Sequence, residues 1–158
     1  MFESQIDATY VWLGVAIVSL VTAGVAASLP AGPPPDAQGV AYTIDTVATG
    51  EYPATAEHGI AADELRLTTE AVSLKRGEET ATTQLTAHRI TPVSSERVDP
   101  RLQQVLSGIP PEMVFEEPAA FKAASDQARA QAGAWQPAPA RLTVRHVQYG
   151  EVHVTLVG

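Results

Sequence analysis

Residues 140–158 read ARLTVRHVQYGEVHVTLVG, and this stretch sets the expected fold. Two runs of alternating apolar and polar residues flank a glycine, which is the pattern of a β-hairpin. A two-residue loop at Tyr149-Gly150 would pair His146 with His153. It would also mix polar side chains into the apolar face and force Tyr149 to a positive φ, which is unfavourable for a bulky residue.

A three-residue loop over residues 148–150 is the alternative, with Gly150 in the left-handed region that glycine tolerates. It pairs Val147 with Glu151 and separates an apolar face from a polar face, so this register is the prediction. The predicted apolar face carries Leu142, Val144, His146, Val152, Val154 and Leu156. The predicted polar face carries Thr143, Arg145, Val147, Glu151, His153 and Thr155.

A second hairpin is predicted in a strand-rich stretch from Glu64 to about Val93. Leu65 and Leu67 alternate with charged and polar neighbours, as in a half-buried strand. The turn is predicted at Arg76-Gly77, with the returning strand continuing towards Pro92. This register places Val72, Leu74, Ala81, Thr83 and Leu85 on one face.

Three short helices are predicted over residues 36–50, 99–108 and 117–133. Each begins with an acidic residue, two of them directly before a proline, and each ends at a glycine. Residues 135–139, which contain two prolines, are expected to link the last helix to the terminal hairpin. The sequence thus predicts an α+β head of antiparallel β-hairpins with two or three short helices.

A transmembrane helix is predicted ahead of this head. Ala8–Leu29 carries no charge, and a helix of that length covers about 33 Å, enough to cross a bilayer. Tyr10 and Trp12 lie at its start, where aromatic rings favour the headgroup level, and Pro30 closes it. A cleaved signal peptide would need a basic region that residues 1–7 lack. A buried core helix would rarely carry so long an uncharged run.

The predicted organisation is a short acidic tail (1–7), a transmembrane helix (8–29), a proline-rich break (30–35) and an α+β head domain (36–158). No Lys or Arg occurs before Arg66, so the positive-inside rule gives little guidance on orientation. The head is acidic, proline-spaced and threonine-rich, which suits an exported domain. We therefore expect a single-pass protein of the cell membrane with an extracytoplasmic head.

Charge and composition exclude several classes of protein. Ten Lys and Arg against 18 Asp and Glu give a net charge of −8, which argues against a nucleic-acid binder. The chain has no cysteine, hence no disulfide framework, thiol nucleophile or cysteine-based zinc site. Low lysine with abundant acidic residues is a bias we associate with proteins of salt-saturated cytoplasms, where a high net charge costs little self-repulsion.

No catalytic motif is present. The sequence contains no G-x-S-x-G, phosphate-binding glycine loop or H-E-x-x-H pattern. His58 and His88 have no second metal ligand at a fixed spacing. The acidic pairs at 78–79 and 116–117 are expected to be solvated, in a turn and at a helix start. We therefore predict no catalytic, cofactor-binding or metal-binding residues, no cofactor, and no enzymatic activity.

Several segments resemble a family of uncharacterised haloarchaeal single-span membrane proteins. The resemblance rests on residues 10–15 (YVWLGV), 33–36 (PPPD), 53–58 (PATAEH), 149–152 (YGEV) and 154–157 (VTLV), so it covers the two ends better than the middle. It implies a pilin-like role or an accessory role in a type IV pilus or Tad-like system. The chain departs from true pilins because no basic residue or glycine precedes the apolar segment. This departure favours an accessory protein that does not polymerise.

Two functions are therefore carried forward. The first is a membrane-anchored structural or interaction protein, with the lipid bilayer and other membrane proteins as partners and no nucleic acid. The alternative is a membrane-tethered ligand-binding or sensing module, which a concave pocket lined by buried polar groups would favour.

Overall fold

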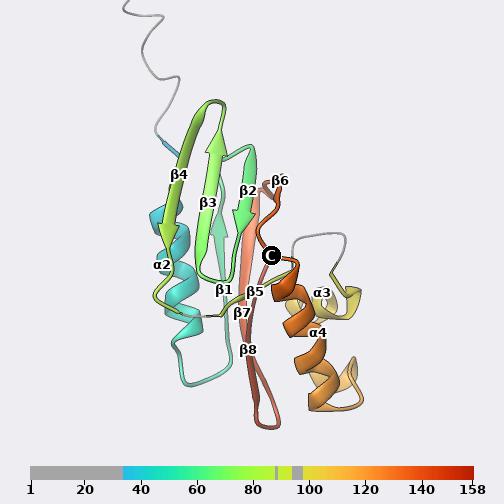
Figure 1. The fold of residues 1–158 in the computed structure, drawn as a ribbon. Coiled ribbons are helices and arrows are strands. Elements are labelled where there is room, and N and C mark those ends of the chain that lie inside the picture. Colours follow the sequence, from blue (N-terminus) through green and yellow to red (C-terminus); the bar gives the residue numbers. More distant parts are fainter. Residues whose placement is uncertain (1–33, 88, 94–97) are drawn as a thin grey trace, which may run out of the picture. The chain divides into compact units, whose positions relative to one another are not determined.

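The computed structural model describes residues 34–87, 89–93 and 98–158 (Figure 1). The predicted acidic tail and transmembrane segment therefore lie outside the described residues. Within the described part, no helix has the length and apolar character needed to cross a membrane. The predicted α+β class is confirmed, because this part folds into two four-stranded sheets with α-helices and a short 3-10 helix.

The first sheet has the strand order β1-β7-β8-β5. It contains β1 (Ala54–Gly59), β5 (Thr91–Pro92), β7 (Arg141–Tyr149) and β8 (Val152–Val157). β7 pairs antiparallel with β1 and β8, whereas β5 runs parallel to the last two residues of β8. β1 was not predicted, because its sequence ATAEHG belongs to a largely exposed edge strand and lacks the apolar alternation of a half-buried one.

The second sheet has the order β4-β3-β2-β6, all antiparallel. It contains β2 (Glu64–Leu67), β3 (Ala71–Arg76), β4 (Glu79–Gln84) and β6 (Trp135–Pro137). β6 lies in the segment predicted to be a linker, and its edge position tolerates a proline. The strand predicted to continue towards Pro92 instead ends at Gln84, and the chain then crosses to the first sheet as β5.

The predicted helix starts are confirmed. The helices are α2 (Ala37–Ala48), α3 (Pro100–Leu106), η1 (Pro111–Met113) and α4 (Pro118–Ala130). Asp36 accepts a hydrogen bond from the backbone N–H of Gly39, and Asp99 accepts one from that of Arg101. Each aspartate thereby satisfies a donor that the first helical turn leaves without a partner.

The first sheet separates two hydrophobic cores. On one side, Leu142, Val144 and Val157 pack with α2 and with the inner face of the second sheet. On the other side, Val147, Val154 and Leu156 pack with α3, η1 and α4. Figure 1 shows α3 and α4 on one side of this sheet and α2 with the second sheet on the other. Both faces of the terminal hairpin are therefore buried over most of its length.

The predicted register of the terminal hairpin is wrong. Tyr149 pairs with Val152 across a two-residue turn at Gly150-Glu151, so neither of the two registers weighed from the sequence occurs. Gly150 has φ +59°, and a positive φ at the first turn residue alone fits a type II′ turn. Val147 consequently pairs with Val154 and not with Glu151. The shift of three residues is odd, so it exchanges the faces of one strand relative to the other.

The register of the hairpin formed by β3 and β4 also differs from the prediction, but its two faces are as predicted. Its turn lies at Gly77-Glu78, not Arg76-Gly77, and Gly77 has φ +57°. Lys75 pairs with Thr80, two residues beyond the predicted partner. An even shift preserves the faces, so the predicted placement of Val72 and Leu74 with Ala81 and Thr83 is confirmed.

Substituting Val147 tests the register of the terminal hairpin. Val147 is buried in the core below α4, and its neighbour Gln148 is exposed. Val147→Asp should lower the free energy of unfolding by about 2 kcal/mol or more, because it buries an unpaired carboxylate. Gln148→Asp is the matched control and should change it by less than about 0.5 kcal/mol. Urea unfolding of both variants gives the two values, and equal costs would contradict this register.

Candidate functional site

A groove of about 520 Å³ lies beside the tip of the terminal hairpin. Its walls come from α4, the end of α2, the loop between β4 and β5, and the tips of β7 and β8. The lining residues are Ala48, Arg89, Lys122, Asp126, Arg129, His146, Glu151, Val152, His153, Val154 and Thr155. It is lined by more charged side chains than the two other hollows described below.

One wall of the groove is a charged face of α4. Phe121, whose side chain is buried, and its helical neighbours hold the opposite face of α4 in the second core. Lys122, Asp126 and Arg129 follow one another at helical spacing and therefore share one face. Lys122 Nζ lies 2.6 Å from Asp126 Oδ2, and Arg129 Nη1 lies 2.8 Å from Asp126 Oδ1. The hydrogen bond from Lys122 is the largest cause that lowers the pKa of Asp126.

Arg89 reaches the same carboxylate from another segment, with its Nη2 3.9 Å from Asp126 Oδ1. Its φ of +71° is the only positive value at a non-glycine residue in the described part of the chain. Such a backbone is uncommon and costs on the order of 1 kcal/mol for a residue with a side chain. The backbone N–H groups of Arg89 and Ile90 both donate to the carbonyl oxygen of Thr69, at 3.1 and 3.3 Å, which holds this backbone in place.

The loop that carries Arg89 is also attached to α2. The Asp45 carboxylate accepts hydrogen bonds from the backbone N–H groups of Thr86 and Ala87, at 3.1 and 2.9 Å. Asp45 lies in the same helix as Ala48, which lines the groove. The loop is therefore fixed on two sides, by α2 and by the turn before β3.

The floor of the groove contains two histidines. His146 Nδ1 lies 3.0 Å from the hydroxyl oxygen of Thr155, its cross-strand partner. The rings of His146 and His153 stack, with centroids 6.0 Å apart and an interplanar angle of 28°. The prediction that these histidines lie on opposite faces is wrong, because the observed register puts both on one face. Burial is the main cause that lowers the pKa of His146, and the charge of His153 adds to it.

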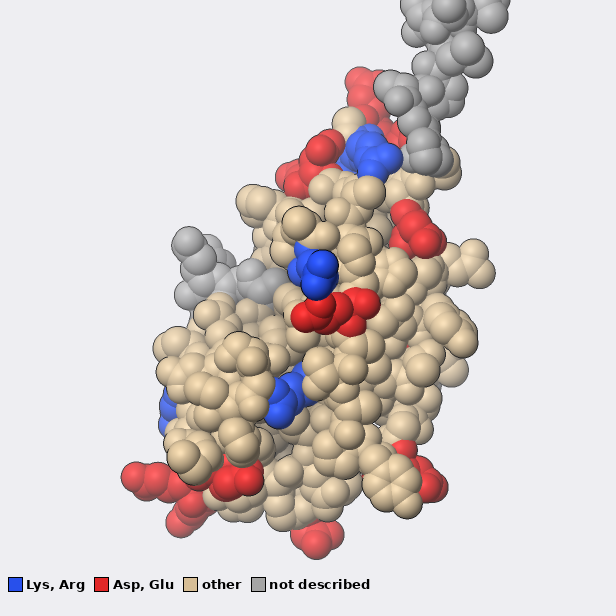
Figure 2. All heavy atoms as spheres, turned by 180° about the vertical axis from the view of Figure 1, so that it is seen from behind, with Lys and Arg blue, Asp and Glu red and all other residues tan. Residues whose placement is uncertain are grey.

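The groove has an excess of positive charge within an acidic protein. Three cationic side chains and two carboxylates, those of Asp126 and Glu151, line it, so the sum is +1 with neutral histidines. The whole chain has a net charge of −8. On the face shown in Figure 2, acidic side chains lie at both the upper and the lower end, and most of the surface is uncharged. The groove therefore differs in sign from the protein that carries it.

Apart from His146 and His153, the described residues singled out in the sequence have separate surroundings. His58 Nδ1 lies 2.9 Å from the hydroxyl oxygen of Thr43, and Glu57 pairs with Arg141 at 2.7 Å. The acidic pairs at 78–79 and 116–117 lie at the β3–β4 turn and before α4, as expected. His88 lies outside the described residues. In the described part, no group of three or more His, Asp or Glu side chains is placed to hold a metal ion.

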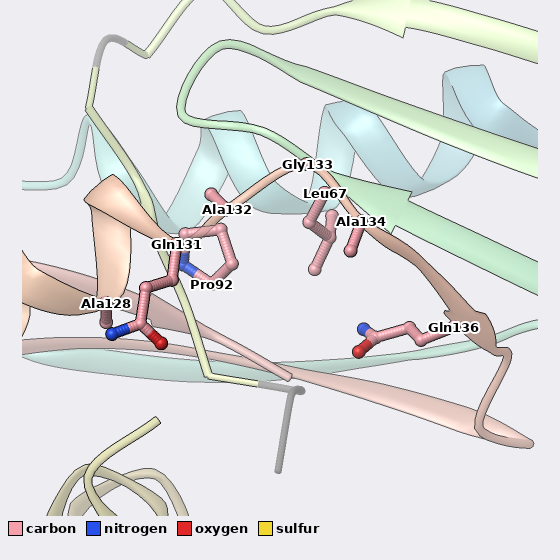
Figure 3. Close-up of a pocket in the computed structure, with 8 residues that line it drawn as sticks. All are labelled: Leu67, Pro92, Ala128, Gln131, Ala132, Gly133, Ala134 and Gln136. Atoms are coloured by element: carbon pink, nitrogen blue, oxygen red, sulfur yellow. The ribbon is translucent and has the colours of Figure 1, made fainter. Parts of the chain in front are cut away.

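Two other hollows have no charged side chain in their lining. A small cavity of about 20 Å³, enough for one water molecule, lies between the end of α4 and strands β2, β5 and β6. Gln131 and Gln136 lie at opposite ends of it (Figure 3). A shallow hollow of about 420 Å³ is mainly apolar. It is lined by Val93, Gln103, Leu106, Pro137, Ala138, Pro139 and Gly158.

Sequence reasoning missed the groove. The spacing of Lys122, Asp126 and Arg129 on a predicted helix was the one signal available, since these residues share a helical face. Arg89 and the hairpin residues come from distant segments, and only the observed register and loop path bring them there.

The chain belongs to DUF7283, a family of unknown function whose profile matches residues 3–147. The match includes both the segment predicted to span the membrane and most of the head. Searches of the curated proteins and of the solved structures find no match. The family relationship therefore assigns no activity, and the function has to be argued from the groove and the sequence.

The low pKa of His146 predicts an acid-sensitive fold. A histidine whose pKa is lower in the folded than in the unfolded chain favours unfolding once it is protonated. Its full stabilising effect is present above the ordinary pKa of 6.5 and is lost as the pH falls below that value. The free energy of unfolding should therefore decrease between about pH 7 and pH 5. Denaturant titrations at several pH values measure this decrease.

The variant His146→Gln isolates this effect, because glutamine does not protonate in this range. Its free energy of unfolding should fall less steeply with decreasing pH than that of the unchanged protein. His153→Gln is the comparison at the neighbouring ring, and it removes the smaller cause of the low pKa of His146. Parallel pH profiles for His146→Gln and the unchanged chain would contradict the interpretation.

Proposed function

We propose that this member of the DUF7283 family is a single-pass membrane protein whose head is a non-catalytic interaction module. The observation that carries the proposal is the uncharged run Ala8–Leu29, which has the length of a membrane-spanning helix. Only six residues, 30–35, separate this run from Asp36, which caps the first helix of the head.

The proposed role is that of a pilin-like or accessory component of an archaeal surface pilus or secretion machine, with an extracytoplasmic head. The resemblance to haloarchaeal single-span proteins supports it, and the β-rich head is compatible with it. Tyr42 on the outer side of α2 and Tyr52 after that helix are largely exposed. Exposed aromatic side chains are enriched at protein interfaces, which supports an interaction role for this part of the head.

A ligand-binding or sensing module is the second candidate, and the groove at the hairpin tip favours it. The groove is concave, and buried polar side chains, His146 and Thr155, form part of its floor. Its volume of about 520 Å³ falls in the range of about 300–1,000 Å³ that small-molecule sites occupy. Both candidates share the membrane anchor and differ in what the head binds.

Membrane attachment predicts resistance to carbonate extraction. The full-length chain in its native membranes should stay in the pellet at alkaline pH, because the apolar segment remains in the bilayer. A charge at the centre of the segment, as in Val18→Arg, costs about 2.5–3.5 kcal/mol and should move a measurable fraction to the supernatant. Ala31→Arg is the matched control outside the segment and should stay in the pellet. Release of the unchanged chain would contradict the proposal.

Orientation is tested separately, by protease digestion of intact cells followed by immunoblotting for the C-terminus. An extracytoplasmic head should be degraded without lysis, whereas a cytoplasmic marker protein should remain intact. Protection of the head until the cells are lysed would place it in the cytoplasm. That result would overturn the surface-machine role but would leave membrane attachment untouched.

A further inference from the structure

We propose that the groove binds a small, multiply charged oxyanion, such as a phosphate- or carboxylate-bearing molecule, through Arg89, Lys122 and Arg129. The inference deepens the second candidate function and rests on it. It does not require membrane attachment, so the binding experiment below and carbonate extraction can fail independently.

The first argument is the ratio of cations to carboxylates. Elsewhere in the described part, ion pairs join one cation to one acid, as in Glu64–Lys75, Asp99–Arg101 and Glu57–Arg141. In the groove three cations share the single carboxylate of Asp126. Only two of them are at hydrogen-bond distance, and Arg89 stays at 3.9 Å. With Asp126 and Glu151 both counted, the lining keeps a net charge of +1, which an anion bound in the groove would compensate.

The second argument is that the side chain of Arg129 and the backbone of Arg89 are held in advance of binding. The side chain of Arg129 is only 15% exposed, and its Nε, although buried, has no hydrogen-bond acceptor. Arg89 is directed to the groove by a backbone in the left-handed region, fixed by Thr69. Backbone strain of this kind clusters at ligand sites, where the surrounding structure imposes it. The ordered side chain of Arg129 loses little entropy when a ligand arrives, whereas that of Arg89 is largely exposed and is fixed only at its backbone.

The third argument concerns the class of ligand. The apolar part of the lining consists of Ala48, Val152 and Val154, and its rings are the two imidazoles. A lining of this kind offers little surface to a large apolar or aromatic ligand. It does offer arginine and lysine donors, which recognise carboxylates and phosphates by charge-assisted hydrogen bonds. Compact, polar anions therefore fit it best.

Asp126 has a definite part in this proposal. Its carboxylate occupies the donors of Lys122 and Arg129, so it competes with an incoming oxyanion for the same groups. Removing that negative charge should strengthen binding, whereas removing a cation should weaken it. A purely structural ion-pair network predicts no binding and therefore no opposite effects of this kind.

Isothermal titration calorimetry of the full-length chain with inorganic phosphate, at fixed ionic strength and pH, tests the proposal. The unchanged chain should show saturable binding. Lys122→Gln and Arg89→Gln alter exposed side chains and should each weaken binding about tenfold, the effect of losing one charge-assisted hydrogen bond. Asp126→Asn should strengthen binding several-fold. Circular dichroism confirms that each variant is folded.

Lys75→Gln is the matched control, because it removes a cation from the Glu64 ion pair on the second sheet. It should bind phosphate as tightly as the unchanged chain. Absence of saturable binding would overturn the proposal. Equal weakening by Lys75→Gln and Lys122→Gln would also overturn it, because the attraction would then depend on overall charge and not on the groove.

Discussion

The fold depends on the register in which β7 pairs with β8. With Tyr149 opposite Val152, alternate residues of the hairpin point into two different cores. Val144 and Val157 meet α2 and the second sheet, while Val147 and Val154 meet α3 and α4. A slip of one residue would move one strand's apolar side chains to the wrong core. Because the helices and both sheets of the described part pack directly or indirectly on this hairpin, its turn at Gly150-Glu151 fixes the layers around it.

The groove lies beside the hairpin tip, where β5 no longer pairs with β8. β5 pairs with β8 only at Leu156 and Val157, so in the described part no strand continues the sheet beside the hairpin tip. There the face that carries Val144 and Val157 continues with His146, Thr155 and His153, which are polar. The face of α4 and the loop of Arg89 close the space that β5 leaves. The same register that buries the apolar residues thus also gathers the polar ones.

Local signals in the sequence were sufficient for the helix starts, because a capping aspartate or an initial proline acts within one turn. The two hairpins were recognised, but both turns were misplaced for the same reason. The glycine was put last in each loop, whereas in the structure a Gly-Glu pair forms the turn with glycine first. The predicted faces of β3 and β4 are correct because their register is shifted by an even number of residues. The predicted faces of the terminal hairpin are wrong because its register is shifted by an odd number. The assumption of one polar face also failed, since a sheet between two cores is apolar on both sides.

The candidate site could not be predicted from local sequence patterns, for a different reason. The sequence spacing predicts that Lys122, Asp126 and Arg129 share one face of a helix, but such a face is ordinarily a solvated surface. This helical face becomes a wall of the groove because Arg89 approaches it from a loop and His146 and His153 approach it from the hairpin. Their approach depends on contacts between segments that are distant in the sequence. The net charge of −8 was a sound argument against a polyanion such as nucleic acid, whose recognition needs an extended basic surface. It does not extend to a small anion, because the cations of the groove would act on such an anion at close range, whereas salt screens the acids farther away on the surface.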